Sequence, residues 1–346
     1  MSAAIAEGNG YTIVENASLE GRNTFRVPAR ANLLIDVRRP SALGEVFDQA
    51  GLGRLPLLVL GEGSNILFTR DWPGIVLSLA TLGIRVLDDD GERARIRVES
   101  GESWNDFVRW SIAKGLRGLE NMVLIPGTVG ASPIQNIGAY GAEVREFVVA
   151  VEAWDRHAGR LVELDNAACA FGYRDSAFKR ERGRYIVTAV VFELTRSREL
   201  RVDYAGVREE LAALGAATPG AAAVAEAIAR IRTRKLPNPA LLGNAGSFFK
   251  NPLVDAGQLA ALLAAHPALP HWPAGGRAKL SAAWLVEACG LRGLREGDAG
   301  VSEQHALVLV NHGQASGTDV LALARRVQDA VRARFGVELE PEPLVV

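Results

Sequence analysis

The segment GNAGSFFKNP, residues 243–252, places one hydroxyl, that of Ser247, between small flexible residues and two phenylalanines. The surrounding composition suggests a floor of apolar rings, Phe248 and Phe249, with polar groups aimed at one spot. A serine in this position can equally cap a turn or a helix. The remaining sequence has to decide between these two interpretations.

Two glycine-rich segments predict a site for a ligand that carries phosphate. GEGSNILF, residues 61–68, follows a predicted strand, and IPGTVGASPIQNIGAYGAEV, residues 125–144, combines glycines and prolines with Gln135 and Asn136 and has almost no charge. Glycine permits positive φ, and successive amides in such turns hold phosphate oxygens. Neither segment has the spacing of a P-loop or a Rossmann fingerprint. The first is also compatible with a plain tight turn, whereas the second favours backbone hydrogen bonds around a large cofactor.

The predicted elements that must position these residues alternate between strand and helix. The sequence therefore predicts a fold class that mixes α-helices and β-strands. Apolar or alternating runs predict strands near residues 55–60, 96–100, 147–155, 185–194 and 306–313. A helix is expected from Ser103, three residues before Asp106, to Gly115, with its apolar side formed by Phe107, Trp110 and Ile112.

The C-terminal half of the sequence is richer in alanine than the N-terminal half. Helices are expected over 211–235, apart from a Thr-Pro-Gly break, and over 260–269 and 321–335. In the last of these, apolar residues stand at 321, 324, 327, 331 and 335, close to helical spacing. The KLPNP segment around Pro237 and Pro239 suggests a hinge between domains.

The composition and charge of the chain exclude several classes of protein. The chain has 346 residues, 48% of them hydrophobic, with 39 Lys and Arg against 40 Asp and Glu, so it can bury a large core and shows no basic excess for nucleic acid or a membrane surface. Cys169 and Cys289 belong to no CxxC pattern and the histidines add no metal-ligand spacing, so we expect buried, reduced thiols and no metal. The first ten residues do not resemble a signal peptide, and no apolar run approaches the ~20 residues of a membrane helix. We therefore expect a soluble cytoplasmic protein.

Five motifs occur in a fixed order along the chain: GEGSN, IPGTVGASPIQNIGAYG, FGYRDSAFK, GNAGSFFKNP and a C-terminal LEPE. Together they resemble the UDP-N-acetylenolpyruvoylglucosamine reductase family, and with Asn23-Thr24-Phe25 they extend over nearly the whole chain to Glu342. The segment VDYAGV around Tyr204 is similar to the longer subtype of this family, in which a tyrosine loop closes over the substrate.

The resemblance implies an α+β fold. It consists of an FAD-binding domain of the vanillyl-alcohol-oxidase/PCMH type, with two α+β subdomains, and a smaller α+β substrate-binding domain. The expected division is residues 1–70 for the first subdomain, 71–200 for the second, 201–236 for the tyrosine loop and a linker helix, and 237–335 for the substrate domain. Residues 336–346 would return near the active site.

The resemblance also implies the reaction. NADPH would reduce non-covalently bound FAD, which would pass hydride to the enolpyruvyl double bond of UDP-GlcNAc-enolpyruvate and give UDP-N-acetylmuramate for peptidoglycan. The implied partners are these small molecules alone, with no nucleic acid and no membrane, and the protein would be a monomer.

Three catalytic roles are carried over from the family. Ser247 matches the proton donor, and Arg174 in FGYRDSAF matches an arginine that grips or polarises the substrate carboxylate. The alternative for Arg174 is a salt bridge with Asp175. Glu342 matches a third catalytic residue, chosen over Glu340 by motif register, although a glutamate so near a terminus is usually solvated. Pro343 and Leu344 follow where the family usually has valine and a basic residue, and the chain stops at Val346.

The remaining site residues are also implied by the motifs. The flavin would be held by Gly61, Glu62, Gly63, Ser64, Asn65, Ile125, Pro126, Gly127, Thr128, Gly130, Ala131, Ser132, Gln135, Asn136, Gly138, Ala139 and Tyr140. The substrate would be held by Tyr173, Tyr204, Lys235, Asn251 and Lys279, with Lys250 as a further candidate. Taken alone, each lysine is as well explained as a solvated surface residue, and Tyr204 as a core residue.

Two other functions remain open. The first is an FAD-linked oxidase on the same scaffold; such enzymes often attach flavin through histidine or cysteine, and neither residue occurs in the glycine-rich segments. The second is an inactive nucleotide-sugar-binding regulator. The presence of Arg174 and Ser247 argues against it, and the short C-terminus favours it.

Overall fold

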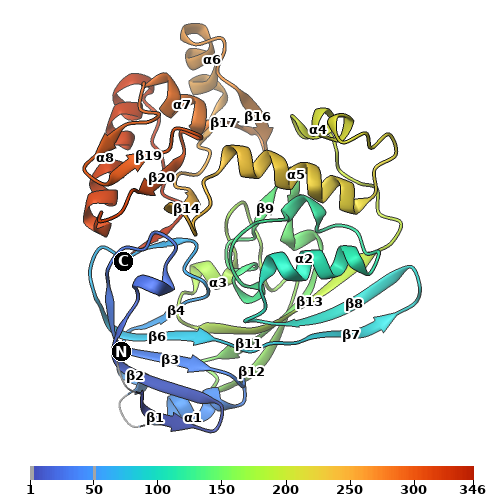
Figure 1. The fold of residues 1–346 in the computed structure, drawn as a ribbon, viewed down its shortest axis with the longest axis vertical. Helices are drawn as coiled ribbons and strands as arrows, with labels where there is room; N and C mark the ends of the chain where they lie inside the picture. The colour runs from blue at the N-terminus through green and yellow to red at the C-terminus, as the bar shows by residue number, and fades with distance from the viewer. Residues whose placement is uncertain (1–3, 50–51) are drawn as a thin grey trace. The chain divides into compact units, whose positions relative to one another are not determined.

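The computed structural model describes residues 4–49 and 52–346, and the chain forms two compact units (Figure 1). Unit 1 consists of Met1–Ala17, Ala31–Glu62 and Trp72–Arg232, and unit 2 of Ser18–Arg30, Gly63–Asp71 and Thr233–Val346. The chain therefore passes between the units several times, and two short N-terminal segments complete a unit that is built mainly from the C-terminal third.

One sheet of unit 1 has the strand order β1-β2-β3-β6-β4. Its strands are β1 (Ala4–Gly8), β2 (Tyr11–Ser18), β3 (Arg30–Val37), β4 (Leu57–Val59) and β6 (Trp72–Leu79). β3 and β4 both run parallel to β6, and α1 (Ala42–Asp48) follows β3. Leu43 and Val46 of α1 share a buried cluster with Ile35, Ile75 and Leu77 of the sheet. The strand expected at residues 55–60 is thus confirmed as β4.

The second sheet of unit 1 is antiparallel and has the order β12-β11-β13-β8-β7. Its strands are β7 (Ile84–Asp89), β8 (Arg93–Glu99), β11 (Val148–Asp155), β12 (Arg160–Asp165) and β13 (Tyr185–Thr195), and a short hairpin is formed by β9 (Gly138–Ala139) and β10 (Ala142–Glu143). The accompanying helices are α2 (Trp104–Ala113), α3 (Ala177–Arg180), α4 (Val207–Ala213) and α5 (Ala221–Lys235). A core cluster joins α2, α4 and α5 to this sheet (Figure 1).

The helix expected after Ser103 forms as α2, but its buried side differs from the expectation. The Ser103 hydroxyl accepts a hydrogen bond from the Asp106 amide at 3.3 Å, and Gly115 follows the helix with φ 73°. Trp104, Phe107, Val108 and Ser111 are buried, whereas Trp110 and Ile112 are only partly buried. The reason is helical geometry, since positions 104, 107, 108 and 111 share one face and 110 and 112 flank it.

Unit 2 contains smaller sheets of order β14-β20-β19-β18, β15-β17-β16 and β21-β5. The strands are β5 (Ile66–Leu67), β14 (Gly243–Ser247), β15 (Leu253–Val254), β16 (His271–Ala274), β17 (Arg277–Leu280), β18 (Arg295–Glu296), β19 (Ala299–Val301), β20 (Val308–Asn311) and β21 (Leu344–Val345). The helices are α6 (Ala256–Ala265), α7 (Ala282–Ala288) and α8 (Gly317–Phe335). β21 pairs in parallel with β5, so the C-terminal segment is a strand of this unit.

Helix α8 confirms the helical spacing expected over 321–335 but begins four residues earlier. Ser316 and Asp319 form a capping box at its start, and Gly336 ends it with φ 63°. The buried face includes Val320 and Leu323, while Leu321 lies partly buried at its edge. The capping box, rather than the first apolar residue, sets where the helix begins.

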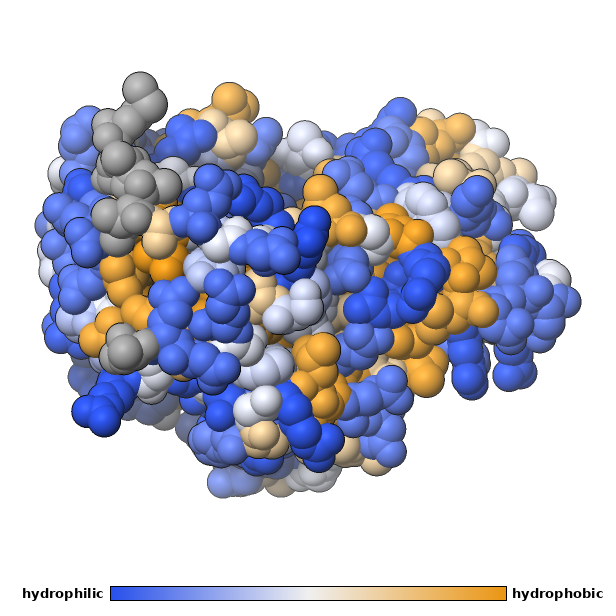
Figure 2. Space-filling model, turned by 90° about the horizontal axis from the view of Figure 1, so that it is seen from below, coloured by the Kyte–Doolittle hydropathy of each residue, from blue (hydrophilic) through white to orange (hydrophobic). Residues whose placement is uncertain are grey.

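Within the described residues, no helix is long and apolar enough to cross a membrane and no cluster of metal-ligating side chains is found. Cys169 is fully buried and Cys289 half-buried, and both are thiols. Burial raises the pKa of Cys169 to about 12. Figure 2 shows one face of the molecule, on which hydrophilic residues are interspersed with separate apolar areas.

Candidate active site

The two glycine-rich segments meet within unit 1. The Glu62 carboxylate accepts a hydrogen bond from the Gly127 amide at 2.9 Å. A Cβ atom placed on Gly61 would lie only 2.9 Å from the Thr128 hydroxyl oxygen. Glu62 and Gly127 are 65 positions apart in sequence, so the two glycine-rich segments form one loop cluster, as expected for a shared ligand site.

The second segment adopts a backbone that few residue types tolerate. Gly127, Asn136, Tyr140 and Gly141 have φ of 122°, 45°, 49° and 83°. Gly130 packs so closely that an added Cβ would lie 1.7 Å from the Ser100 hydroxyl oxygen. Non-glycine residues with positive φ are uncommon and concentrate at functional turns. The conformation is that of a tightly wrapped binding loop.

Buried hydroxyl groups beside this loop have no partner among the described residues. These are the hydroxyls of Thr81, Ser132 and Thr188, each in a residue no more than 2% exposed. Backbone hydrogen bonds of residues 100 and 101 connect the elements that carry them. The Ser100 amide donates to the Thr188 carbonyl, and the Gly101 amide donates to the Thr81 carbonyl. The Ser100 carbonyl accepts from the Gly130 amide, in the loop that contains Ser132. Buried polar groups are normally paired, so this part of unit 1 fits a polar ligand such as FAD.

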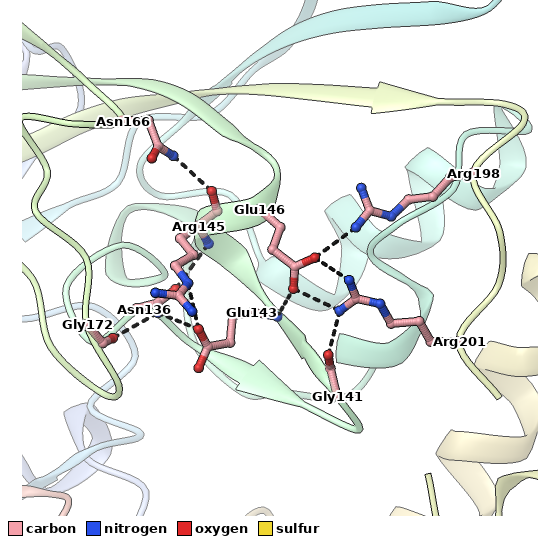
Figure 3. A network of polar contacts seen from close by, with 9 residues as sticks. All are labelled: Asn136, Gly141, Glu143, Arg145, Glu146, Asn166, Gly172, Arg198 and Arg201. Carbon is pink, nitrogen blue, oxygen red and sulfur yellow. Dashed lines mark hydrogen bonds and ion pairs between the residues drawn. The ribbon is translucent and has the colours of Figure 1, made fainter. Parts of the chain in front are cut away.

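The side chain of Asn136 is engaged by the protein itself (Figure 3). Its amide nitrogen donates to the Glu143 carboxylate at 3.1 Å and to the Gly172 carbonyl at 2.9 Å, and its oxygen accepts from the Arg145 amide. Asn136 thus ties the loop of residues 125–144 to the segment that contains Arg174. Any contact of Asn136 with a cofactor would have to come from its backbone.

Arg174 is held at the same loop. It has φ 53°, and its guanidinium donates to the Gly138 carbonyl at 2.9 Å. Its guanidinium carbon lies 5.6 Å from the centre of the Tyr173 ring, which is 37% exposed. Asp175 forms an ion pair with Arg180. The Arg174 guanidinium therefore lies beside the loop of residues 125–144. Tyr173, which is expected to hold the substrate, lies next to it.

Tyr204 also lies at this loop, in the segment between β13 and α4. Its ring is 51% exposed and contacts the Tyr140 ring edge-on, with centres 5.0 Å apart. Burial raises the pKa of Tyr140, and the nearby Arg232 charge opposes this rise. Unit 1 therefore brings together Tyr140, Arg174 and Tyr204, which the sequence places far apart.

Ser247 ends β14 of unit 2 after a bulge. The pairing of β14 with β20 shifts register between Asn244 and Ser247, and Gly246 has φ 69°. An added Cβ on Gly243 would lie 2.4 Å from the Phe25 carbonyl oxygen. The small residues before Ser247 therefore serve two needs, close packing at Gly243 and positive φ at Gly246.

The phenylalanines after Ser247 are buried, at 0% and 1% exposure for Phe248 and Phe249. The Phe248 carbonyl accepts a hydrogen bond from the Glu342 amide at 2.8 Å. Glu340 instead forms an ion pair with Lys250. Glu342 and Glu340 thus both contact residues 248–250, and the choice of Glu342 from motif register stays a prediction.

The other expected substrate residues lie in unit 2. Lys235 is exposed at the end of α5, and Lys279 on β17 lies 6.0 Å from the centre of the Trp272 ring. The Asn251 side-chain oxygen accepts the Ala282 amide at the start of α7, at 3.0 Å. Nearby His305 is largely buried, which lowers its pKa, and the charge of Lys235 lowers it further.

Several residues of this region gave no signal in the sequence. Thr81, Thr188 and Ser100 come from separate elements and join the loop cluster only through the fold. Glu146 and Asn121 bind the segment before Tyr204, although both lie just outside the motifs. Contacts between residues far apart in sequence leave no local pattern.

Comparison with known proteins gives consistent results. The family model for the C-terminal domain of UDP-N-acetylenolpyruvoylglucosamine reductase matches residues 238–346, and an FAD binding domain model matches residues 32–165. The UDP-N-acetylenolpyruvoylglucosamine reductases of Xanthomonas euvesicatoria and Xanthomonas axonopodis are each 52% identical over 339 residues, which cover 97% of this chain and 97% of the relative. The chain belongs to the UDP-N-acetylenolpyruvoylglucosamine reductase family. The crystal structure of the Thermus caldophilus family member aligns with a TM-score of 0.68 at 26% identity and covers 95% of this chain and 97% of that one.

Family membership confirms several expectations from the sequence. The α+β class with an FAD-binding domain and a separate C-terminal domain is confirmed, as are FAD as the cofactor and the class of oxidoreductases. The alternative of an inactive regulator is not supported.

Proposed function

We propose that this chain reduces the enolpyruvyl double bond of UDP-N-acetylglucosamine enolpyruvate to give UDP-N-acetylmuramate, with NADPH as the electron donor. The observation that carries the proposal is the placement of Ser247, after a positive-φ bulge and next to a residue hydrogen-bonded to Glu342. The bulge and this hydrogen bond fix the backbone on either side of Ser247. A fixed backbone suits a hydroxyl that delivers a proton to one carbon better than a mobile surface loop would. We further propose that the protein acts in the cytoplasm as a monomer.

When bound, FAD would supply the chemistry that side chains lack, the transfer of two electrons from NADPH to the alkene carbon as hydride. The backbone of Gly61–Asn65 would hold its pyrophosphate, and Ile125–Tyr140 would extend along the rest of the cofactor. Support for this assignment comes from the positive-φ loop and from the unpartnered hydroxyls of Thr81, Ser132 and Thr188.

The protein's part is to stabilise charge and to deliver one proton. Arg174, always cationic, would orient the substrate carboxylate and stabilise negative charge as it develops there. Ser247 would donate its hydroxyl proton to the carbon that does not receive hydride. Glu342 would assist in this proton transfer.

Binding of the UDP moiety is assigned to the residues that the family motifs indicate. Lys235 and Lys279 would contact phosphate as point charges, Asn251 would add a hydrogen bond, and Tyr173 and Tyr204 would cover the substrate. The domain edges expected from the sequence, with a hinge near Pro237, remain part of this proposal.

The half-reactions test the function directly. The flavin of the anaerobic holoenzyme is reduced with one equivalent of NADPH, and UDP-N-acetylglucosamine enolpyruvate is then added while the visible flavin band is followed. Prompt return of the band is expected. A flavin that is bleached but returns only when oxygen is admitted would overturn the proposal in favour of an oxidase.

The role of Ser247 is tested by Ser247→Ala in the same assay. We expect NADPH to reduce the flavin at the wild-type rate and the second half-reaction to slow by ~10²–10⁴-fold, as for loss of a positioned general acid. Ser316→Ala, which removes the α8 cap of the same unit, serves as the control and should lower stability by ~1 kcal/mol without affecting either half-reaction. If Ser247→Ala behaves like Ser316→Ala, Ser247 is not the proton donor.

A further inference from the structure

The β9–β10 hairpin is joined to the segment before Tyr204 by a network centred on Glu146 (Figure 3). One carboxylate oxygen of Glu146 accepts from Arg201 at 2.8 Å and from the Glu143 amide at 3.0 Å. The other accepts from Arg198 at 2.8 Å and from a second nitrogen of Arg201. Glu146 therefore connects the end of the hairpin with two arginines of residues 198–201.

Arg201 carries this connection to the turn of the hairpin. Its guanidinium also donates to the carbonyl of Gly141, in the turn between β9 and β10. The buried Asn121 side chain donates to two carbonyls, that of Tyr140 at 2.9 Å and that of Arg201 at 3.0 Å. The backbones of residues 140–141 and of Arg201 are thus fixed to each other at several points.

Tyr204 follows Arg201 by three positions and rests its ring on Tyr140. Because a tyrosine that is 51% exposed has little packing of its own, its position depends on the backbone that carries it. The Glu146 network, together with the Asn121 side chain, anchors that backbone to the hairpin.

The network differs from ordinary surface ion pairs. The Glu146 side chain is 25% exposed and receives hydrogen bonds from two arginines and a main-chain amide, one of the arginines bidentate. Burial would by itself raise the pKa of Glu146, but the hydrogen bond from Arg201 and the Glu143 amide lower it below its ordinary value. Glu226 and Arg230 on α5, about half exposed, form the usual weak (i, i+4) pair.

We propose that Glu146 is a positioning residue for substrate binding, which acts through Arg201 by holding Tyr204 at the flavin-side hairpin. The inference rests on the proposed function, because it takes Tyr204 to contact the UDP-linked substrate. Glu146 itself touches neither substrate nor cofactor.

The test uses Glu146→Gln, which keeps the shape of the side chain and removes its charge, and Glu226→Gln as the matched control. Each change is made in the wild-type and in a Tyr204→Ala background. The holoenzymes are compared by KM and kcat for UDP-N-acetylglucosamine enolpyruvate, by the rate of flavin reduction with NADPH, and by amide hydrogen exchange over residues 199–205.

In the wild-type background, Glu146→Gln should raise the KM for the enolpyruvyl substrate roughly 3–10-fold, the size of one lost charge-assisted contact, with kcat changed less than about twofold. Flavin reduction should be unchanged, and exchange over 199–205 should become faster. In the Tyr204→Ala background the same change should leave KM unaltered, since Glu146 acts through Tyr204. Glu226→Gln should have no effect in either background.

Other outcomes overturn the inference. An unchanged KM in Glu146→Gln, or an equal rise in both backgrounds, would show that Glu146 does not act through Tyr204. A loss of FAD or of thermal stability with unchanged KM would assign it a structural role alone. Failure of the wild-type enzyme to turn over the enolpyruvyl substrate would instead overturn the proposed function, so the two failures can be told apart.

Discussion

The carboxylate of Asp155 shows how one residue can matter without belonging to a motif. It is 4% exposed, accepts hydrogen bonds from the Arg184 guanidinium at 3.0 and 3.2 Å, and accepts the His157 amide at 2.9 Å. The hydrogen bond from Arg184 holds the pKa of Asp155 below its usual range, and burial opposes it only in part. The side chain thus stabilises the end of β11 as an anion.

This predicts a pH-dependent loss of stability in Asp155→Asn. A depressed folded pKa contributes stability above the ordinary aspartate pKa of about 3.9, and that stability is lost as the pH falls through the folded pKa. At pH 7 the free energy of unfolding in urea should therefore fall by ~1–3 kcal/mol, and the difference from wild type should shrink below about pH 3.9.

Glu226→Gln again provides the comparison for Asp155→Asn, since its exposed pair should contribute at most ~0.5 kcal/mol. A difference between Asp155→Asn and wild type that does not change with pH would show that the charge of Asp155 is not what stabilises the fold.

At the scale of elements, the β9–β10 hairpin depends on the backbone of its turn. Tyr140 and Gly141 both have positive φ, at 49° and 83°, as a two-residue hairpin turn that matches strand twist requires. No atom lies within 4 Å of the position of a Cβ on Gly141, so a side chain there meets no steric obstacle. A substitution of Gly141 can therefore destabilise the fold only through the strain of its positive φ.

Gly141→Ala should therefore lower the free energy of unfolding by ~1–2 kcal/mol, the usual penalty of a left-handed residue with a Cβ. Gly21→Ala is the matched control, because Gly21 also faces open space and its φ is not in the left-handed region. There the change should be neutral or stabilising by up to ~1 kcal/mol, since alanine restricts the unfolded chain. Equal effects in the two variants would mean that the turn is not strained. Urea unfolding followed by circular dichroism measures both.

At the scale of the whole molecule, the expected catalytic residues are divided between the units, with Arg174 in unit 1 and Ser247 and Glu342 in unit 2. The same holds for the first glycine-rich segment, since the chain leaves unit 1 after Glu62 and enters unit 2 at Gly63. A function that needs all of these residues needs both units folded.

Removal of FAD should accordingly destabilise the protein. A ligand that binds only the folded state adds RT ln(1 + [L]/Kd), about 2.7 kcal/mol at a hundredfold excess over Kd, so apoprotein titrated with FAD should gain stability by this relation in urea unfolding. Riboflavin, which lacks the pyrophosphate and adenosine, should have a much smaller effect if the glycine-rich segments hold the pyrophosphate. A stability that is indifferent to FAD would contradict the assignment of the loop cluster to the cofactor.

The sequence by itself determined the local features. Apolar, β-branched runs located strands β11 and β13, cap signals located helix α2, and helical spacing located helix α8, because these signals depend only on neighbouring residues. The order of the motifs identified the family, and through it FAD and the candidates Arg174, Ser247 and Glu342.

Only the tertiary structure decided which distant residues meet. It joined Glu62 to Gly127, brought the unpartnered hydroxyls of Thr81 and Thr188 to the loop of residues 125–144, and linked Glu146 to Arg201. The physical reason is that such contacts are selected by chain topology and by the need to pair buried polar groups. Neither requirement leaves a periodic or contiguous pattern in the sequence.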